Sequence, residues 1–100
     1  MVARTWRGWT RSEDADEYAE YIAETGPRAY RETPGNQGAW IMRREEDGRT
    51  LFVTLSFWES LEAIRAFAGD DIERAVYYPE DDRFLVERED RVEHWELQEF

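Results

Sequence analysis

The chain contains no cysteine and no lysine, and it has no long apolar stretch. Without cysteine, disulfide bridges, thiolate metal sites and a thiol nucleophile are all excluded. No apolar run approaches the length that spans a membrane, and the amino-terminal "MVARTWRGWT" lacks the apolar core of a signal peptide. These absences predict a cytoplasmic protein that does not enter a membrane.

Positive charge is also scarce. The chain has 24 acidic residues against 13 basic ones, all of them arginine, and its formal net charge is −11. Binding the phosphates of a nucleic acid requires a positive surface, so nucleic acid is not an expected partner. The sequence has no glycine-rich phosphate loop and no GxSxG motif, which argues against nucleotide-dependent enzymes and hydrolases.

Metal ligands are few as well. The acidic runs "SEDADE", "REED" and "PEDD" lack the alternating oxygen ligands, central glycine and terminal glutamate of a calcium loop, so they are interpreted as solvated surface. His94 is the only histidine, and without a second histidine or a cysteine a zinc or iron site is not expected.

Apolar and aromatic residues are well represented in spite of the charge. Hydrophobic residues make up 41% of the chain and include five tryptophans, which is enough apolar surface to fold. One hundred residues correspond to a single small domain, 1–100, whose core is necessarily modest. Further burial would have to come from a partner.

The first half of the chain predicts a strand, a helix and a strand. Residues 3–10 are rich in Trp and Thr, as strands are. Thr10 or Ser12 can cap a helix that has an acidic first turn and an apolar stripe at helical spacing, and Gly26 and Pro27 are predicted to stop it. After a turn, "AWIMRR" predicts the next strand.

The second half predicts a hairpin, helices and a last strand. Asp47-Gly48 supports a tight hairpin leading into the strand "TLFVTLSFW". Ser60 is the expected cap of a helix that Gly69 ends. Asp70 and Glu73 resemble a capping box for one more short helix, which would end at Pro79. An acidic loop follows, and "RVEHWELQEF" is the predicted fourth strand.

The element order β-α-β-β-α-β predicts an α+β, ferredoxin-like fold with two helices across one face of a four-stranded antiparallel sheet. Large apolar residues occupy both faces of the last two strands. On one face the third strand has Leu51, Val53, Leu55 and Phe57, and on the other it has Phe52 and Trp58. The helices can cover only one face. The second face is therefore expected to pack on another copy of the chain, as a homodimer.

With this order of elements, the chain resembles the antibiotic biosynthesis monooxygenase-like family, within the dimeric α+β barrel superfamily. The resemblance covers nearly the whole chain and is carried by the element order and by the segments "SFWES", "FAGDDIERAVYYPEDD" and "VEHWEL". It implies a dimer of ferredoxin-like subunits, each with a small-molecule pocket between its sheet and its own helices. Relatives include oxygenases that act on aromatic substrates without metal or flavin, haem-degrading enzymes, isomerases of small acids and proteins with no assigned activity.

The haem-degrading relatives use an asparagine on the first strand, a tryptophan on the second helix and a histidine ten residues further on. The matching positions here are Phe67 and Tyr77, and the first strand has no asparagine. No cofactor is therefore expected, with haem kept as an alternative, held in that case by a Tyr77 tyrosinate.

The candidate catalytic residues are His94 and Tyr77. His94 is the one side chain that ordinarily titrates near neutral pH, so it is the candidate general base, unless it is only a hydrogen-bonded residue of the sheet. The Tyr77 hydroxyl either points into the pocket, or its ring packs and the hydroxyl reaches water or a backbone carbonyl. Candidate substrate-binding residues, with core packing or exposure to solvent as the alternative, are Trp58, Phe67, Tyr78, Trp40 and Arg44.

These residues lead to two functional hypotheses. The first is a small homodimer that binds an aromatic molecule and oxidises it as a cofactor-independent monooxygenase, with a base that ionises the substrate so that the substrate itself reduces oxygen. The second is a dimer that binds a ligand or haem without catalysis.

Overall fold

The computed structural model describes all 100 residues and contains one antiparallel sheet. Strand β1 (Val2–Arg11) lies inside the sheet, with β3 (Arg49–Trp58) on one side of it. On its other side β1 pairs with two short strands, β4 (Leu85–Arg88) and β5 (Glu93–Glu96). Strand β2 (Asn36–Glu46) pairs with β3 and forms the outer edge. The predicted ferredoxin-like α+β class is confirmed, with the fourth strand divided into two pieces.

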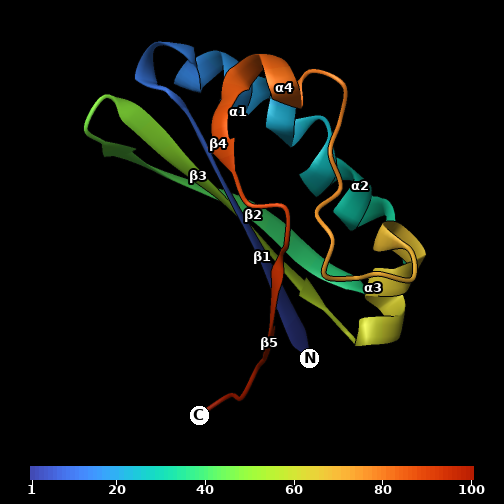
Figure 1. Ribbon diagram of the computed structural model, residues 1–100. Helices are drawn as coiled ribbons and strands as arrows, with labels where there is room; N and C mark the ends of the chain where they lie inside the picture. The colour runs from blue at the N-terminus through green and yellow to red at the C-terminus, as the bar shows by residue number, and fades with distance from the viewer.

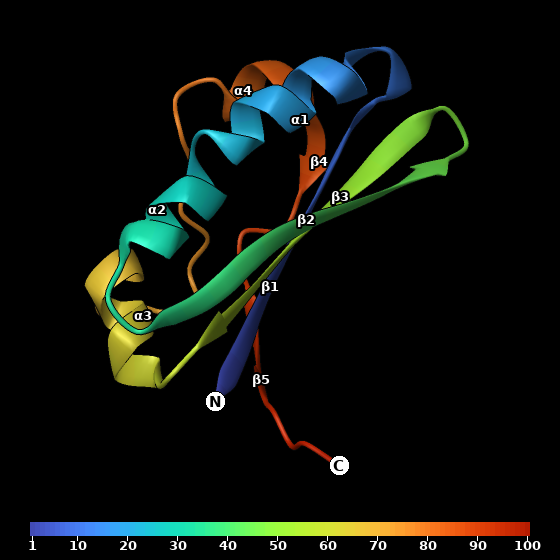
Figure 2. The same cartoon turned by 180° about the vertical axis from the view of Figure 1, so that it is seen from behind.

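All helical segments lie on the same face of this sheet, and the opposite face carries none (Figures 1 and 2). The segments are the short η1 (Ser12–Asp14), α1 (Ala15–Ala23), α2 (Gly26–Glu32), α3 (Leu61–Ala68) and α4 (Asp81–Phe84). None of them is both long and apolar enough to serve as a membrane span.

Two local predictions are confirmed. Asp47 and Gly48 have φ angles of 48° and 82°, the left-handed conformation that a tight hairpin turn between β2 and β3 requires. Ser60 caps α3, because its hydroxyl oxygen accepts a hydrogen bond from the Ala63 amide at 3.2 Å.

Gly26 and Pro27, predicted to stop the first helix, also begin a second one that the sequence did not predict. Helix α1 ends at Ala23, and Gly26 and Pro27 form the first turn of α2. A proline is favoured in a first helical turn because the amide that it lacks would have no partner inside the helix.

The short helix predicted from Asp70 and Glu73 is also absent. The backbone of this segment pairs with distant chain instead: the Ala75 amide donates to the Asp90 carbonyl at 2.8 Å, and the Val92 amide donates to the Glu73 carbonyl at 2.7 Å. These long-range bonds replace the helical ones, so the chain between α3 and α4 is irregular. The predicted acidic loop, in turn, contains α4 and β4.

The core lies between the sheet and the helices. One cluster gathers around Tyr18 and Phe52, and a smaller one consists of Tyr30, Trp58 and Ile64. Only 22 of the 100 residues are buried, so the monomer builds the modest core that its length predicts.

The helix-free side, called the open face below, is rich in apolar side chains. The strand register places these apolar residues on it: Ala3, Trp9, Trp40, Met42, Leu51, Val53, Leu55, Phe57 and Trp95. Charged residues, among them Arg7, Arg44 and Glu93, lie between them. Trp40, Met42 and Trp95 are each about half exposed (50%, 47% and 51%). A large apolar surface of this kind marks an interaction site more often than a free surface.

Candidate functional site

A buried arginine lies on the helix-covered face of β1. Arg4 pairs across the sheet with Ser56 of β3 and with His94 of β5, and only 2% of its surface is exposed. It is the only buried arginine of the chain, and no carboxylate forms an ion pair with it. A buried charge without a counter-ion is energetically costly, so Arg4 is the most unusual residue of the core.

One end of the Arg4 guanidinium is well bonded and one edge is not. Nη1 donates to the carbonyl oxygen of Ile72 at 2.5 Å and lies 2.9 Å from Nε2 of His94. The buried Nε and Nη2 atoms make no hydrogen bond of good geometry, and the Tyr30 phenol is the polar side chain near the guanidinium on the helix side. Burial lowers the pKa of Arg4 and the neighbouring Tyr30 phenol opposes this shift, but a guanidinium stays protonated in proteins.

His94 is held as a neutral acceptor by this contact. Because every nitrogen of Arg4 is a donor, Nε2 of His94 must accept, which leaves the ring proton on Nδ1. Burial of the half-buried imidazole lowers its pKa, the positive charge of Arg4 lowers it further, and Glu73 opposes the shift. The only histidine of the chain is therefore next to the only buried cation.

Aromatic rings surround this pair. Tyr30 from α2 packs edge-on against Trp58 and Phe67, with ring centroids 5.8 Å and 4.6 Å away. The guanidinium carbon of Arg4 lies 5.9 Å from the centroid of the Phe67 ring. Trp58 is completely buried, and its indole N–H donates to Ser56 Oγ at 2.8 Å. The surroundings of Arg4 are thus apolar and aromatic.

A small inner cavity adjoins Tyr30. It has a volume of about 30 Å³, and its polar lining includes Tyr18, Tyr77, Tyr78 and Asp81. Asp81 accepts from the Tyr78 amide at 2.7 Å and from the Tyr18 hydroxyl at 3.3 Å, while burial raises the pKa of both Asp81 and Tyr18. A space of this size holds one or two water molecules and no organic ligand.

Tyr77 and Tyr78 differ in how their hydroxyls are bonded. The Tyr77 hydroxyl donates to the Glu89 carbonyl and accepts from the Trp6 indole N–H at 3.3 Å, and its ring lies edge-on to Trp6. The Tyr78 hydroxyl makes no hydrogen bond to the protein, although its ring also lines the inner cavity. Tyr77 is therefore anchored to the backbone, whereas Tyr78 has a free hydroxyl.

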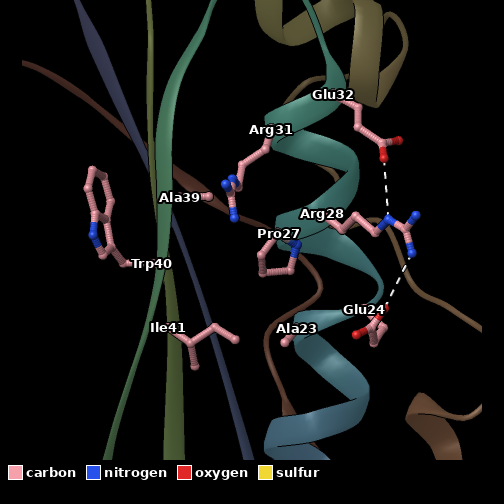
Figure 3. Close-up of a pocket in the computed structure, with 9 residues that line it drawn as sticks. All are labelled: Ala23, Glu24, Pro27, Arg28, Arg31, Glu32, Ala39, Trp40 and Ile41. Carbon is pink, nitrogen blue, oxygen red and sulfur yellow. Dashed lines mark hydrogen bonds and ion pairs between the residues drawn. The ribbon is translucent and has the colours of Figure 1, made fainter.

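A larger groove opens between α1, α2 and the edge strand β2 (Figure 3). Its volume is about 670 Å³, and Ala39 and Ile41 point into it from the strand while Trp40 points away. Arg28, on its outer rim, pairs with both Glu24 and Glu32 at 3.3 Å. Ala39 pairs with Ser56, and Ser56 pairs with Arg4, so one row of the sheet leads from this groove to Arg4.

The structure brings some of the expected site residues together and leaves others apart. His94, Trp58 and Phe67 gather around Arg4, and Tyr77 and Tyr78 line the inner cavity. The two remaining residues are distant from both places. Trp40 lies on the open face against Phe57, and Arg44 is exposed and paired with Glu46 at 3.0 Å.

Sequence reasoning missed Arg4, Tyr30 and Asp81. The signal for Arg4 was present, because strand alternation places residue 4 on the same face as Val2 and Trp6. Tyr30 was missed because it lies on α2, a helix that the sequence did not predict. Asp81 was missed because an acidic run indicates solvent, and only the fold shows that one of its carboxylates is buried.

The fold and this cluster define a ferredoxin-like domain with a polar site inside an aromatic core, between its sheet and its helices. The sequence profile described as antibiotic biosynthesis monooxygenase matches residues 1–75, so the chain belongs to that family. A search of curated proteins found no similar sequence.

Among solved structures, the chain is similar to a mutant of MhuD with two manganese protoporphyrin IX molecules bound per active site. The TM-score is 0.66 at 19% sequence identity, and the similarity covers 97% of this chain and 94% of that one. At this level of identity the likeness concerns the fold.

The inner cavity of about 30 Å³ holds neither a haem nor another organic ligand as its side chains stand. Two candidate axial ligands are engaged in this arrangement, His94 by Arg4 and Tyr77 by the Glu89 carbonyl, whereas the Tyr78 hydroxyl is free.

Proposed function

We propose that this chain is one subunit of a homodimer that binds a small aromatic molecule between its sheet and helices and oxidises it with molecular oxygen, without metal or flavin. The observation that carries the proposal is the Arg4–His94 pair, a neutral imidazole beside a fixed positive charge in an aromatic core. Membership of the antibiotic biosynthesis monooxygenase family supports it.

The pair provides the two functions that such a reaction needs. Nε2 of His94 removes the proton from an acidic phenol or enol of the substrate, and Arg4 stabilises the resulting oxyanion. The electron-rich ring carbon of this anion reduces oxygen and forms a carbon–oxygen bond to give a peroxide. The peroxide takes the proton back from His94 and loses water, so that one oxygen atom stays on the substrate as a carbonyl.

For this step the substrate must take the place that Arg4 holds on Nε2 of His94. Loss of that one contact frees the lone pair of the imidazole. The depressed pKa of His94 keeps the imidazole neutral near pH 7, which is the form that accepts a proton. Tyr77, anchored through its hydroxyl to the Glu89 carbonyl, positions the wall of the inner cavity in this proposal.

The homodimer is proposed from the open face. Its exposed Trp40, Met42 and Trp95 give an apolar surface that a second copy would cover. This surface has a hollow of about 290 Å³ that side chains of the partner would fill, and its lining is half apolar and half arginine: Met42, Leu51, Val53, Arg7, Arg43 and Arg44.

A second candidate is a dimeric binding protein without catalysis. The engaged Nε2 of His94 favours it, because a histidine that permanently accepts from Arg4 cannot act as a base.

Oxygen uptake with a panel of hydroxylated aromatic compounds separates the two candidates. Under the first, oxygen consumption is substrate-dependent, is unaffected by chelators and falls at least about 100-fold in His94→Gln, the typical contribution of a general base. Ligand binding without oxygen consumption by the unmodified protein would favour the second.

A further inference from the structure

The two partnerless nitrogens of Arg4 belong to the same edge of its guanidinium group. Nε and Nη2 carry parallel N–H bonds along that edge, whereas both contacts of Arg4 to the protein are made by Nη1. An edge with two parallel donors matches the two oxygens of a carboxylate, which is the common geometry of arginine–carboxylate pairs.

We infer that the Nε–Nη2 edge of Arg4 is the receptor for the carboxylate of an aromatic acid. The inference rests on the proposed ligand site between sheet and helices and names the chemical class of its ligand. One carboxylate supplies one negative charge and two acceptors, which are what this buried cation lacks. The ring of the acid would contact the aromatic side chains around Arg4: Tyr30, Trp58 and Phe67.

Other anions fit the edge less well. A phosphate carries more charge and more acceptor oxygens than one guanidinium edge satisfies, and the neutral His94 adds no positive charge. The remaining arginines are all outside the core, and most of them are paired with surface carboxylates. A phenolate offers a single oxygen and would leave one donor of the edge without an acceptor.

The cost of burying Arg4 supports a role in binding. An unpaired charge in the core destabilises the fold, and an aliphatic side chain of similar volume at such a site is often neutral or stabilising. A residue retained only for stability would be expected to have its own carboxylate partner. Arg4→Met is therefore expected to unfold at the same or a higher urea concentration than the unmodified protein while losing the anion site.

An acid of this size cannot enter the structure as it stands. The carbonyl of Ile72 covers Arg4, and the inner cavity holds about 30 Å³. Residues 69–80, which include Ile72, have no helix or strand, and the later part of this segment is held by the Ala75 amide and the Tyr77 hydroxyl. Binding is therefore expected to move only the residues around Ile72 away from Arg4.

Calorimetric titration with benzoate, and with benzamide as its neutral analogue, tests the inference. The unmodified protein is expected to bind benzoate at least about tenfold more tightly than benzamide, and Arg4→Gln is expected to lose that preference. Arg11→Gln is the matched control on the same strand, because Arg11 is exposed and pairs only with Glu13, and its preference should be unchanged. Equal affinity of the unmodified protein for the two compounds would overturn the inference.

Two further measurements do not depend on how Arg4→Gln folds. In the unmodified protein, benzoate is expected to shift the Nε–H resonance of Arg4 and slow its exchange with water, whereas an unchanged resonance would mean that buried water satisfies this edge. Arg4→Lys keeps the charge and loses the double donor, so it should bind benzoate at least about tenfold more weakly. Inorganic phosphate should not compete with benzoate, and competition by it would instead assign the edge to phosphate.

The outcome separates the inference from the proposed function. Benzoate binding without oxygen uptake from any hydroxylated aromatic acid would retain the carboxylate site and remove the oxygenase. Oxygen uptake with neutral phenols, without any preference for acids, would retain the oxygenase and remove the carboxylate site.

Discussion

At the scale of single residues, the adjacent Tyr77 and Tyr78 offer a direct comparison. The Tyr77 hydroxyl bonds to the Glu89 carbonyl and the Trp6 indole, whereas the Tyr78 hydroxyl bonds to nothing in the protein. Tyr77→Phe is expected to lower the free energy of unfolding by about 0.5 to 1.5 kcal/mol, the usual net value of a hydrogen bond. Tyr78→Phe should leave it unchanged within about 0.5 kcal/mol. Urea unfolding measures both, and equal losses in the two variants would contradict the assigned roles.

His94 gives a pH dependence whose sign follows from its surroundings. Burial and the charge of Arg4 hold its pKa below the ordinary value of 6.5. Folding therefore favours the neutral ring, so this contribution to stability is complete above about pH 6.5 and is lost as the pH falls through the folded-state pKa.

The expected outcome is that, on going from pH 7 towards pH 5, the free energy of unfolding of the unmodified protein falls relative to that of His94→Gln. Because the chain has one histidine, the difference between the two slopes belongs to His94. A parallel pH profile in the variant would show that His94 titrates as it does in the unfolded chain.

Single residues of the site could be predicted from the sequence only in part. His94 is predicted from its chemistry, because it is unique in the chain, Trp58 from its strand position near the helices, and Phe67 from the family resemblance. Arg4 was not, because an arginine in a strand ordinarily points to solvent. Which face of β1 the helices cover decides its burial, and that depends on pairing with residues about 50 and 90 positions away.

At the scale of the elements, the end of α3 is controlled by Gly69. Its φ of 84° and ψ of −168° belong to a region that only glycine adopts readily. No atom lies within 4 Å of the position of an added Cβ, so a substitution there tests backbone strain alone. Gly69→Ala is expected to lower the free energy of unfolding by about 1 to 3 kcal/mol.

Asp70→Ala is the control for this variant. Asp70 is the next residue, is exposed and forms no side-chain hydrogen bond or ion pair, so its variant should leave the free energy of unfolding unchanged within about 0.5 kcal/mol. Thermal unfolding of the two variants measures the contrast, and equal losses in both would reverse the interpretation.

The same elements show what local sequence determines. The β2–β3 hairpin and the Ser60 cap were predicted because turn and cap chemistry lie within four residues. The absent helix after Gly69 and the divided last strand were not predicted, because long-range bonds such as Ala75 to Asp90 outweigh a local capping pattern. A glycine is common just after the end of a helix, and a proline is common in the first turn of one. The pair Gly26-Pro27 therefore does not show by itself whether a helix ends or begins there.

At the scale of the whole molecule, the proposed homodimer requires that a second copy of the chain cover the open face. Leu55 lies on that face in the middle of β3, paired with Thr5 of β1 and Trp40 of β2. If a second copy covers this face, Leu55→Asp places an unpaired charge in an apolar interface, which costs several kcal/mol. We expect the unmodified chain to elute in gel filtration with light scattering at about twice 12.0 kDa, and Leu55→Asp to elute as the monomer with a lower urea midpoint.

The control must add the same charge to the other side of the molecule. Leu61 is 43% exposed and begins α3, where an aspartate suits the positive end of the helix dipole. Leu61→Asp should therefore keep the mass and the stability of the unmodified protein. A well-folded monomer of the unmodified chain at micromolar concentration would contradict the homodimer. If both variants stayed dimeric, the open face would not be the interface, and the exposed edge strand β2 would be the next surface to test.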